Sequence, residues 1–468
     1  MIKQNLLKEL QLIVGRGNVL SSPEDLVCYS YDAAPLPAGN LPDAVVLPSS
    51  TEEVVGLLRL AQAEGIKVVP RGAGTNLSGG TVPVEGGIVV QLTRMNRMEI
   101  DSRNLIATVE PGVITSNLHS AVEDMGLFYP PDPASANVST IGGNVAECAG
   151  GLRGLKYGTT KDYVIGLETV LANGEVLVTG GKTVKNVAGY DLTKLMVGSE
   201  GTLGIFTKII LRLIPLPETK RTLSITYPNF QDAAASVSDI IANRILPATL
   251  EFLDKVTINC VEAHTHIGLP RNAEAFLLIE VDGSKSDVEW EAKRVAEICS
   301  RHHPLAVKQA LTLSEAMSLT LARRSALASL ARVRPTTILE DVTVPPSRLT
   351  EMVSEISRIV QKHDIQVGIF GHAGDGNLHP TFLTDERDEE EMRRVEAAIS
   401  EVFEVTLKLG GTISGEHGIG LTKIRFLPWE ARPSGLKAMR VIKDGFDPQN
   451  ILNPGKIFTA PGDKDNES

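Results

Sequence analysis

One stretch decides the fold of this sequence: Val68-Val69-Pro70-Arg71-Gly72-Ala73-Gly74-Thr75-Asn76-Leu77-Ser78-Gly79. Its glycines allow backbone N–H groups to turn toward an anion, and the side chains of Thr75, Asn76 and Ser78 add further donors. The stretch is not a Rossmann fingerprint, because Leu77 stands where the third glycine is required, and it lacks the Gly-Lys-Ser/Thr of a P-loop. Taken alone, it fits a turn between two strands equally well.

Further glycine-rich loops strengthen the interpretation as a ligand cradle. They are Ile141-Gly142-Gly143-Asn144-Val145-Ala146, Ala149-Gly150-Gly151, Lys156-Tyr157-Gly158 and Gly198-Ser199-Glu200-Gly201-Thr202-Leu203-Gly204-Ile205. Several such loops at strand ends within one domain suit a long, flat ligand that lies across many turns. The sequence therefore predicts a dinucleotide cradle that is not of the Rossmann type.

The pattern of apolar residues predicts an α+β fold with two main parts. Strands are expected at residues 44–47, 67–69, 88–92, 106–109, 166–171, 176–179 and 205–213, and a helix at 50–64. Pro215 and Pro217 then mark a boundary, since proline interrupts both helix and sheet. Beyond it, helices at 230–242, 288–301, 349–363 and 388–409 accompany strands at 275–281 and 366–370, which indicates an antiparallel sheet covered by helices. The expected domains are 1–217 and 218–420, followed by a C-terminal segment at 421–458 and a disordered tail at 459–468.

Composition excludes several classes of function. With 46 Lys and Arg against 57 Asp and Glu, the net charge of −11 argues against nucleic acid as a partner. Cys28, Cys148, Cys260 and Cys299 are too widely spaced to hold an iron–sulfur cluster. The sequence shows neither a signal peptide nor an apolar run long enough to cross a membrane, so we expect a cytoplasmic protein. Peripheral association with a membrane through a partner is left open.

Two glycine-rich strings concentrate the chemistry in the second half. They are Gly371-His372-Ala373-Gly374-Asp375-Gly376-Asn377-Leu378-His379 and Ser414-Gly415-Glu416-His417-Gly418. A single histidine is more often structural than functional, but two histidines and a carboxylate in flexible loops suit a divalent ion such as Zn, Mn or Fe. The glycines between His372 and His379 argue against a helix, so both are expected to come from a strand end and a loop.

The glycine loops of the first half, in Pro70-Arg71-Gly72-x-Gly74-Thr75, in the stretch at 130–158 and at 198–205, together resemble the FAD domain of the vanillyl-alcohol oxidase superfamily. Within it, the chain is similar to the group of glycolate oxidase catalytic subunits, D-lactate dehydrogenases and D-2-hydroxyglutarate dehydrogenases, over about residues 43–458. The resemblance implies a two-part FAD-binding domain, an α+β cap with an antiparallel sheet, and a C-terminal segment that returns to the FAD domain. Some relatives attach FAD covalently through a histidine in the first glycine loop. This loop has Thr75-Asn76 instead, so non-covalent FAD is expected.

The resemblance also assigns residues to the cofactor. It places the pyrophosphate on Arg71, Gly72, Ala73, Gly74, Thr75, Asn76 and Ser78, the flavin against Pro131, Asp132, Ser135, Gly142, Gly143 and Asn144, and the adenine half at Gly204 and Ile205.

For the chemistry, the resemblance implies a metal on His372, His379 and Glu416 and a base at His417. Asn377 would bind the substrate or orient a ligand, and Arg323 would hold the substrate carboxylate. Here the chain departs from its relatives. Thr320 stands where relatives of the glycolate branch have a tryptophan, and Leu327 where they have an aromatic residue. The lysine with which the 2-hydroxyglutarate branch holds the second carboxylate is absent near residues 337–338, and this absence favours D-lactate or glycolate over 2-hydroxyglutarate.

The leading hypothesis is therefore an FAD-dependent dehydrogenase of a small 2-hydroxy acid. Because the chain has no cluster of its own, its electrons would pass to an iron–sulfur subunit or an electron-transferring flavoprotein, while a quinone-linked partner and direct transfer to oxygen are left open. Two alternatives remain at this stage: a flavin-free metal-dependent oxygenase or hydrolase on His372, His379 and Glu416, and a non-catalytic flavoprotein subunit that relays electrons. The presence of a candidate base and of a complete set of metal ligands counts against a subunit that only relays electrons.

Overall fold

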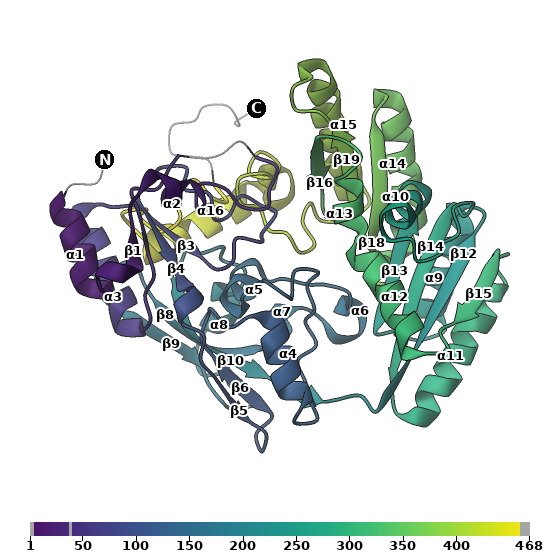
Figure 1. Cartoon of the computed structure of the whole chain (residues 1–468), viewed down its shortest axis with the longest axis horizontal. Coiled ribbons are helices and arrows are strands. Elements are labelled where there is room, and N and C mark those ends of the chain that lie inside the picture. The colour runs from purple at the N-terminus through teal and green to yellow at the C-terminus, as the bar shows by residue number, and fades with distance from the viewer. Residues whose placement is uncertain (1–3, 37–39, 459–468) are drawn as a thin grey trace.

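The computed structural model describes residues 4–36 and 40–458. The predicted disordered tail at 459–468 lies outside these ranges. The chain forms two units that stand side by side (Figure 1). We call residues up to 217, together with the C-terminal segment at 421–458, the first unit, and residues 218–420 the cap.

The first unit opens with a small four-stranded sheet in the order β1-β2-β4-β3, where β2, β4 and β3 run parallel. Apolar faces of α1 and α3 cover it through Leu10, Leu57 and Leu58, all fully buried. The elements of this part are α1 (Gln4–Val14), η1 (Arg16–Asn18), β1 (Val19–Leu20), α2 (Pro23–Val27), β2 (Ala44–Val46), α3 (Thr51–Glu64), β3 (Val68–Arg71), β4 (Ile88–Gln91) and η2 (Leu92–Arg94).

A five-stranded antiparallel sheet completes the first unit, in the order β5-β6-β10-β8-β9, with the short pair β7 and β11 beside it. The unit is therefore built on two main sheets, as a two-part domain requires. Its elements are β5 (Met98–Asp101), β6 (Ile106–Val109), α4 (Thr115–Glu123), β7 (Leu127–Phe128), α5 (Ile141–Glu147), α6 (Gly154–Tyr157), α7 (Thr160–Tyr163), β8 (Val164–Val170), β9 (Val176–Gly180), α8 (Leu192–Met196), β10 (Ile205–Arg212) and β11 (Ile214–Pro215).

The cap is built on an eight-stranded antiparallel sheet, in the order β15-β12-β14-β13-β18-β19-β16 with β17 paired to β19. Its strands are β12 (Thr219–Tyr227), β13 (Thr249–Asp254), β14 (Ala275–Gly283), β15 (Ala306–Gln309), β16 (Thr336–Leu339), β17 (Val342–Thr343), β18 (Gln366–His372) and β19 (Asn377–Thr384). Its helices are α9 (Phe230–Ala242), α10 (Lys255–Thr265), α11 (Lys285–Ser300), α12 (Leu313–Arg324), α13 (Ala326–Leu330), η3 (Pro346–Arg348), α14 (Leu349–His363) and α15 (Glu389–Lys408).

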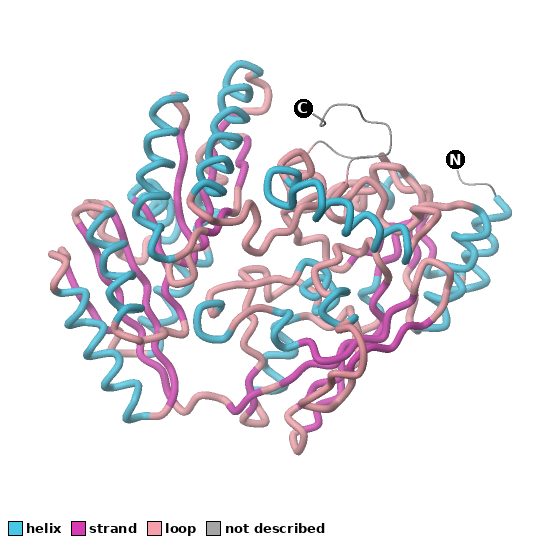
Figure 2. Tube along the Cα trace, turned by 180° about the vertical axis from the view of Figure 1, so that it is seen from behind, coloured by secondary structure: helices cyan, strands magenta, loops and turns pink. Residues whose placement is uncertain are grey.

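Alternation of side chains along the central strand explains why helices cover both faces of this sheet. In β14, Leu277 and Ile279 join the core shared with α9, α11, α14 and α15, whereas Phe276 and Leu278 join a second core with α10 and α13. A strand buried on both faces needs cover on both. Figure 2 shows the first group of helices standing along one side of the cap strands.

The C-terminal segment lies on the first unit. Helix α16 (Leu427–Phe446), interrupted around Pro433, leads into a stretch that pairs with β3 through a bridge between Leu452 and Val68. The Asn453 side chain donates to the carbonyl groups of Gly80 and Glu200, at 2.8 and 2.7 Å. The end of the chain thus ties two glycine loops of the first unit together.

The predicted α+β fold class with an antiparallel cap sheet is confirmed, and two predicted helices, 230–242 and 349–363, have the bounds found in the structure. In the described part of the chain, no helix combines the length and apolar character needed to cross a membrane.

Candidate active site

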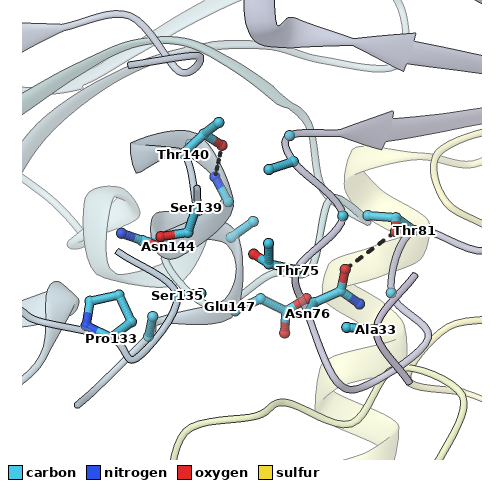
Figure 3. A pocket seen from close by; sticks show the side chains of 18 of the residues that line it. Ala33, Thr75, Asn76, Thr81, Pro133, Ser135, Ser139, Thr140, Asn144 and Glu147 are labelled. Atoms are coloured by element: carbon cyan, nitrogen blue, oxygen red, sulfur yellow. Dashed lines mark hydrogen bonds between the residues drawn. The ribbon is translucent and has the colours of Figure 1, made fainter. Parts of the chain in front are cut away.

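A cavity of about 580 Å³ runs along the glycine loops of the first unit and reaches the cap. Figure 3 shows Thr75, Asn76, Ser135, Asn144 and other wall residues around it. Most of the predicted cofactor-binding residues lie on its wall: Arg71, Gly72, Ala73, Gly74, Thr75, Asn76, Ser135, Gly142, Gly143, Asn144, Gly204 and Ile205. The structure therefore brings loops from distant parts of the sequence to one cavity.

Three predicted cofactor residues do not lie on this wall. Ser78 is fully buried, and its backbone carbonyl accepts from Leu421. The carbonyl of Pro131 is hydrogen-bonded to His119 at 2.9 Å. Asp132 is buried and forms an ion pair with Arg324 at 2.6 Å, so it links the first unit to the cap.

The cap contributes Glu416 and His417 to the same cavity. They lie close to His372 and His379, which the register of a β-hairpin brings together. His372 ends β18 and pairs with Asn377, whereas His379 pairs with Phe370, two residues before His372, so the two histidines are diagonal neighbours on one face. Both histidines therefore come from strands, and the prediction that a loop would supply one of them was wrong.

The donor atoms of three predicted ligands converge. Glu416 Oε1 lies 3.3 Å from His372 Nε2 and 3.4 Å from His379 Nε2. Donors bound about 2.1 Å from one ion in a tetrahedral arrangement are about 3.4 Å apart, so this spacing fits a metal with two imidazoles and one carboxylate. His417 Nε2 is farther from the same oxygen, at 3.9 Å.

A second group of potential ligands, Asp341, His379 and His417, also lies close together. Its carboxylate is already occupied by hydrogen bonds. Asp341 Oδ2 accepts from the backbone of Glu416 and His417, both at 2.9 Å, and Oδ1 accepts from Asn377 at 2.5 Å. The first group, His372, His379 and Glu416, is therefore the better metal site.

Electrostatics divide the roles within the cluster. Burial alone would lower the pKa of His372, but the carboxylates of Glu251 and Glu416 outweigh burial and raise it well above its ordinary value. Burial would raise the pKa of Glu416, yet His372 and His379 hold it well below its ordinary value. Burial lowers the pKa of His417 to about 4, against the opposing effect of Asp341. At neutral pH the imidazole of His417 is therefore uncharged and free to accept a proton.

Glu251 orients His372 and was missed from the sequence. This fully buried carboxylate is the cross-strand partner of His372, and its Oε1 lies 2.6 Å from His372 Nδ1. Such a bond fixes the tautomer that leaves Nε2 for a metal. The other oxygen of Glu251 accepts from Nε of Arg323. The sequence offered one indication of its role, an acidic residue within the apolar strand Thr249-Leu250-Glu251-Phe252.

Arg323 lies beside this pair rather than on the cavity wall. It is buried, its guanidinium stands 4.8 Å from the ring centre of Phe370, and only its Nε is bonded to Glu251. Among the described residues, no hydrogen bond uses its two terminal nitrogens. The neighbouring Arg324 does line the cavity.

Asn377 does not line the cavity either. Its amide donates to Asp341 and to Thr343 Oγ1, at 2.5 and 2.8 Å. Of the two roles predicted for Asn377, this placement favours orienting other residues over contact with a substrate. Asp341 itself was also missed; it is a fully buried acid between β16 and β17.

The two units meet closely at Gly150. A Cβ atom added there would stand 2.6 Å from Glu416 Oε2, so any side chain at this position would require the Glu416 carboxylate to move. The glycine loop of the first unit therefore touches a predicted metal ligand of the cap directly, and the cavity is continuous with the histidine cluster.

Comparison with known proteins accords with this arrangement. Residues 42–180 match an FAD binding domain, and residues 216–457 match the C-terminal domain of FAD linked oxidases. The chain is 53% identical to the glycolate oxidase subunit GlcD of Bacillus subtilis, over 99% of each chain. It is 39% identical to a D-lactate dehydrogenase of Archaeoglobus fulgidus, over 92% of this chain and 95% of the relative.

Solved structures show the same fold at low identity. One of p-cresol methylhydroxylase with substrate bound superposes with a TM-score of 0.79 at 19% identity, over 98% of both chains. An alkyldihydroxyacetonephosphate synthase reaches 0.77 at 20% identity, over 97% of this chain and 86% of the other. With two glycine-lined sheets, an antiparallel cap and both domain matches, the chain belongs to the FAD-linked oxidases of the vanillyl-alcohol oxidase superfamily, and it is an FAD-binding oxidoreductase.

Proposed function

We propose that this protein is an FAD-dependent dehydrogenase that oxidises a small 2-hydroxy acid, D-lactate or glycolate, to the 2-oxo acid. One observation carries the proposal: the neutral base His417 lies on the wall of the FAD cavity, beside the three converging donors of His372, His379 and Glu416. Relatives that match over most of the chain are named glycolate oxidase subunit and D-lactate dehydrogenase.

In the proposed reaction, His417 accepts the proton of the substrate hydroxyl. FAD held in the cavity would accept the hydrogen of the carbon that carries this hydroxyl together with its electron pair, so that the C–O single bond would become a carbonyl. A divalent ion on His372, His379 and Glu416 would lower the pKa of that hydroxyl when bound. Because the first glycine loop has Thr75 and Asn76 and no histidine, we propose that FAD is held without a covalent bond.

For the substrate carboxylate, we propose Arg323. Glu251 holds the guanidinium through Nε and bonds His372 with its other oxygen, so the arginine is fixed next to a proposed metal ligand. The terminal nitrogens are then left to form a forked pair with a carboxylate. Arg324, on the cavity wall, adds positive charge for an anion in a chain whose net charge is −11.

Arg323→Lys is expected to raise the KM for the 2-hydroxy acid about 10- to 100-fold, because a lysine keeps a cation beside Glu251 but loses the fork. The measurement is steady-state kinetics with an artificial acceptor. Arg334→Ala serves as the control, since Arg334 forms a partly exposed pair with Glu391. An unchanged KM in Arg323→Lys would restrict Arg323 to holding Glu251.

We further propose that electrons leave to a separate protein, an iron–sulfur subunit or an electron-transferring flavoprotein. All four cysteines lie in the described part of the chain and all are free thiols. The relatives from Bacillus subtilis and Escherichia coli are named as subunits of glycolate oxidase, which supports a partner. We place this function in the cytoplasm, with membrane association only through such a partner.

Anaerobic titration tests the function. The purified protein is expected to show a flavin spectrum that D-lactate or glycolate bleaches within seconds, whereas D-2-hydroxyglutarate bleaches it slowly. Membership of the FAD-linked oxidases has already removed the flavin-free alternative. Flavin that no 2-hydroxy acid reduces would favour the non-catalytic relay instead.

A further inference from the structure

The segment at residues 414–420, which carries Glu416 and His417, has no regular structure of its own; we call it the histidine loop. Its first half is fixed by the cap. Asp341 Oδ2 accepts from the backbone N–H groups of Glu416 and His417, both at 2.9 Å, and from Ser414 Oγ at 3.1 Å. Asp341 is fully buried, so these bonds face no competition from water.

The second half of the histidine loop is fixed by the first unit. Glu200 Oε1 accepts from the backbone N–H of Ile419 at 2.8 Å, and Oε2 accepts from that of Gly420 at 2.7 Å. Glu200 is also buried. Both of its oxygens are therefore bonded to the loop, across the boundary between the two units.

Glu200 is itself held rigidly. Its backbone adopts φ of 51°, a left-handed conformation that is unusual outside glycine. The surrounding structure supports this conformation, because the N–H of Glu200 donates to Ala146 at 2.9 Å and its carbonyl accepts from Asn453 at 2.7 Å. A carboxylate anchored in this way transmits the position of the first unit to the loop.

Between the two anchor points, Gly418 packs closely against two carboxylates of the first unit. Its φ is 82°, and an added Cβ would stand 2.5 Å from Glu147 Oε2 and 2.9 Å from Glu200 Oε1. The loop backbone is pressed against the wall of the FAD cavity, to which Glu147 and Glu200 both belong.

We propose that Glu200 is a positioning residue that sets where His417 stands relative to FAD, whereas Asp341 sets the geometry of the metal ligands. The proposal rests on the proposed function, in which His417 is the base. Without Glu200, the loop would stay attached to the cap through Asp341, so the ligands would remain together. The first unit, however, would no longer fix the position of His417 relative to FAD. A small displacement of a reacting group lowers the reaction rate strongly.

The test compares Glu200→Ala and Glu200→Gln with wild type in the FAD-loaded enzyme. In Glu200→Ala, the rate of flavin reduction at saturating D-lactate is expected to fall about 10- to 100-fold, while KM and the bound metal per chain stay within about twofold. Glu200→Gln retains one acceptor oxygen and is expected to recover part of the rate. Hydrogen exchange at the amides of Ile419 and Gly420 should accelerate, while the amides of Glu416 and His417 stay protected.

Two further variants give contrasting patterns. Asp341→Asn is expected to expose the amides of Glu416 and His417 and to weaken metal binding about 10- to 100-fold. Glu262→Ala is the matched control, because Glu262 also accepts two backbone N–H groups of a loop, those of Gly268 and Leu269, far along the cap. It should leave the rate of flavin reduction unchanged.

The proposal would be overturned if Glu200→Ala kept the wild-type rate, lost metal as Asp341→Asn does, or left exchange at Ile419 and Gly420 unchanged. Failure of the proposed function looks different: no 2-hydroxy acid would then reduce the wild-type flavin. In that case the exchange pattern alone would decide whether Glu200 holds the histidine loop.

Discussion

Replacing His417 with alanine is expected to lower the rate of flavin reduction by a 2-hydroxy acid about 10²- to 10⁴-fold, the usual contribution of a general base. FAD and metal should stay bound. The reason is that His417 is proposed as the base, whereas His372, His379 and Glu416 are proposed as the metal ligands. Burial lowers the pKa of His417 to about 4, so its ring is neutral at pH 7, and its Nε2 stands farther from Glu416 Oε1 than the nitrogens of His372 and His379 do.

The measurement is anaerobic stopped-flow spectroscopy of the flavin band, with metal content determined on the same sample. His302→Ala is a suitable control, because His302 is hydrogen-bonded to Asp239 of helix α9 at 2.8 Å and is not part of the histidine cluster. A wild-type rate in His417→Ala would remove His417 as the base. Loss of metal along with the rate would instead point to the alternative ligand group of Asp341, His379 and His417.

His379→Ala is expected to release the divalent ion and to lower the rate of flavin reduction by about 10²- to 10⁴-fold, because a bound ion contributes several kcal/mol to stabilising the developing alkoxide. His379 is almost fully buried, and its Nε2 is one of the two imidazole donors near Glu416. FAD binding should persist, since His379 is not on the wall of the cofactor cavity.

Metal analysis before and after chelation, followed by addition of Zn, Mn or Fe salts, checks this expectation. Wild type treated with a chelator should behave like His379→Ala and should regain its rate with one of these ions, whereas the variant should not. A chelated wild type that is still reduced at full rate would remove the metal from the mechanism. His264→Ala, at a histidine bonded to Ser329, controls for general loss of a ring.

Much of the fold could be predicted from local patterns in the sequence. The helix at 230–242 was predictable because Asn229 caps it, accepting from the N–H of Asp232, and because its apolar residues recur with helical spacing. The glycines between His372 and His379 correctly excluded a helix, but they showed neither that His379 lies within a strand nor the register of the hairpin. Neighbouring strands determine that register, and no local periodicity records it.

Contacts between distant segments account for what the sequence did not reveal. Glu251 meets His372 only because β13 and β18 are adjacent in the sheet, although 121 residues separate the two side chains. Glu200 and Ile419 are 219 residues apart. The family resemblance assigned Ser78 and Asp132 to the cofactor, yet the direction in which each loop points its side chain depends on tertiary packing.

The contact between Gly150 and Glu416 bears on how this enzyme could be re-engineered. Exchanging the cap for that of a relative, in order to change substrate, would join a foreign histidine loop to a native glycine loop with no free space between them. A successful chimaera would therefore need to transfer residues 147–151 and 198–201 together with the cap. Grafting at the apparent boundary near Pro217 alone should yield a protein that binds FAD but turns over slowly, because the two halves of one active centre would no longer match.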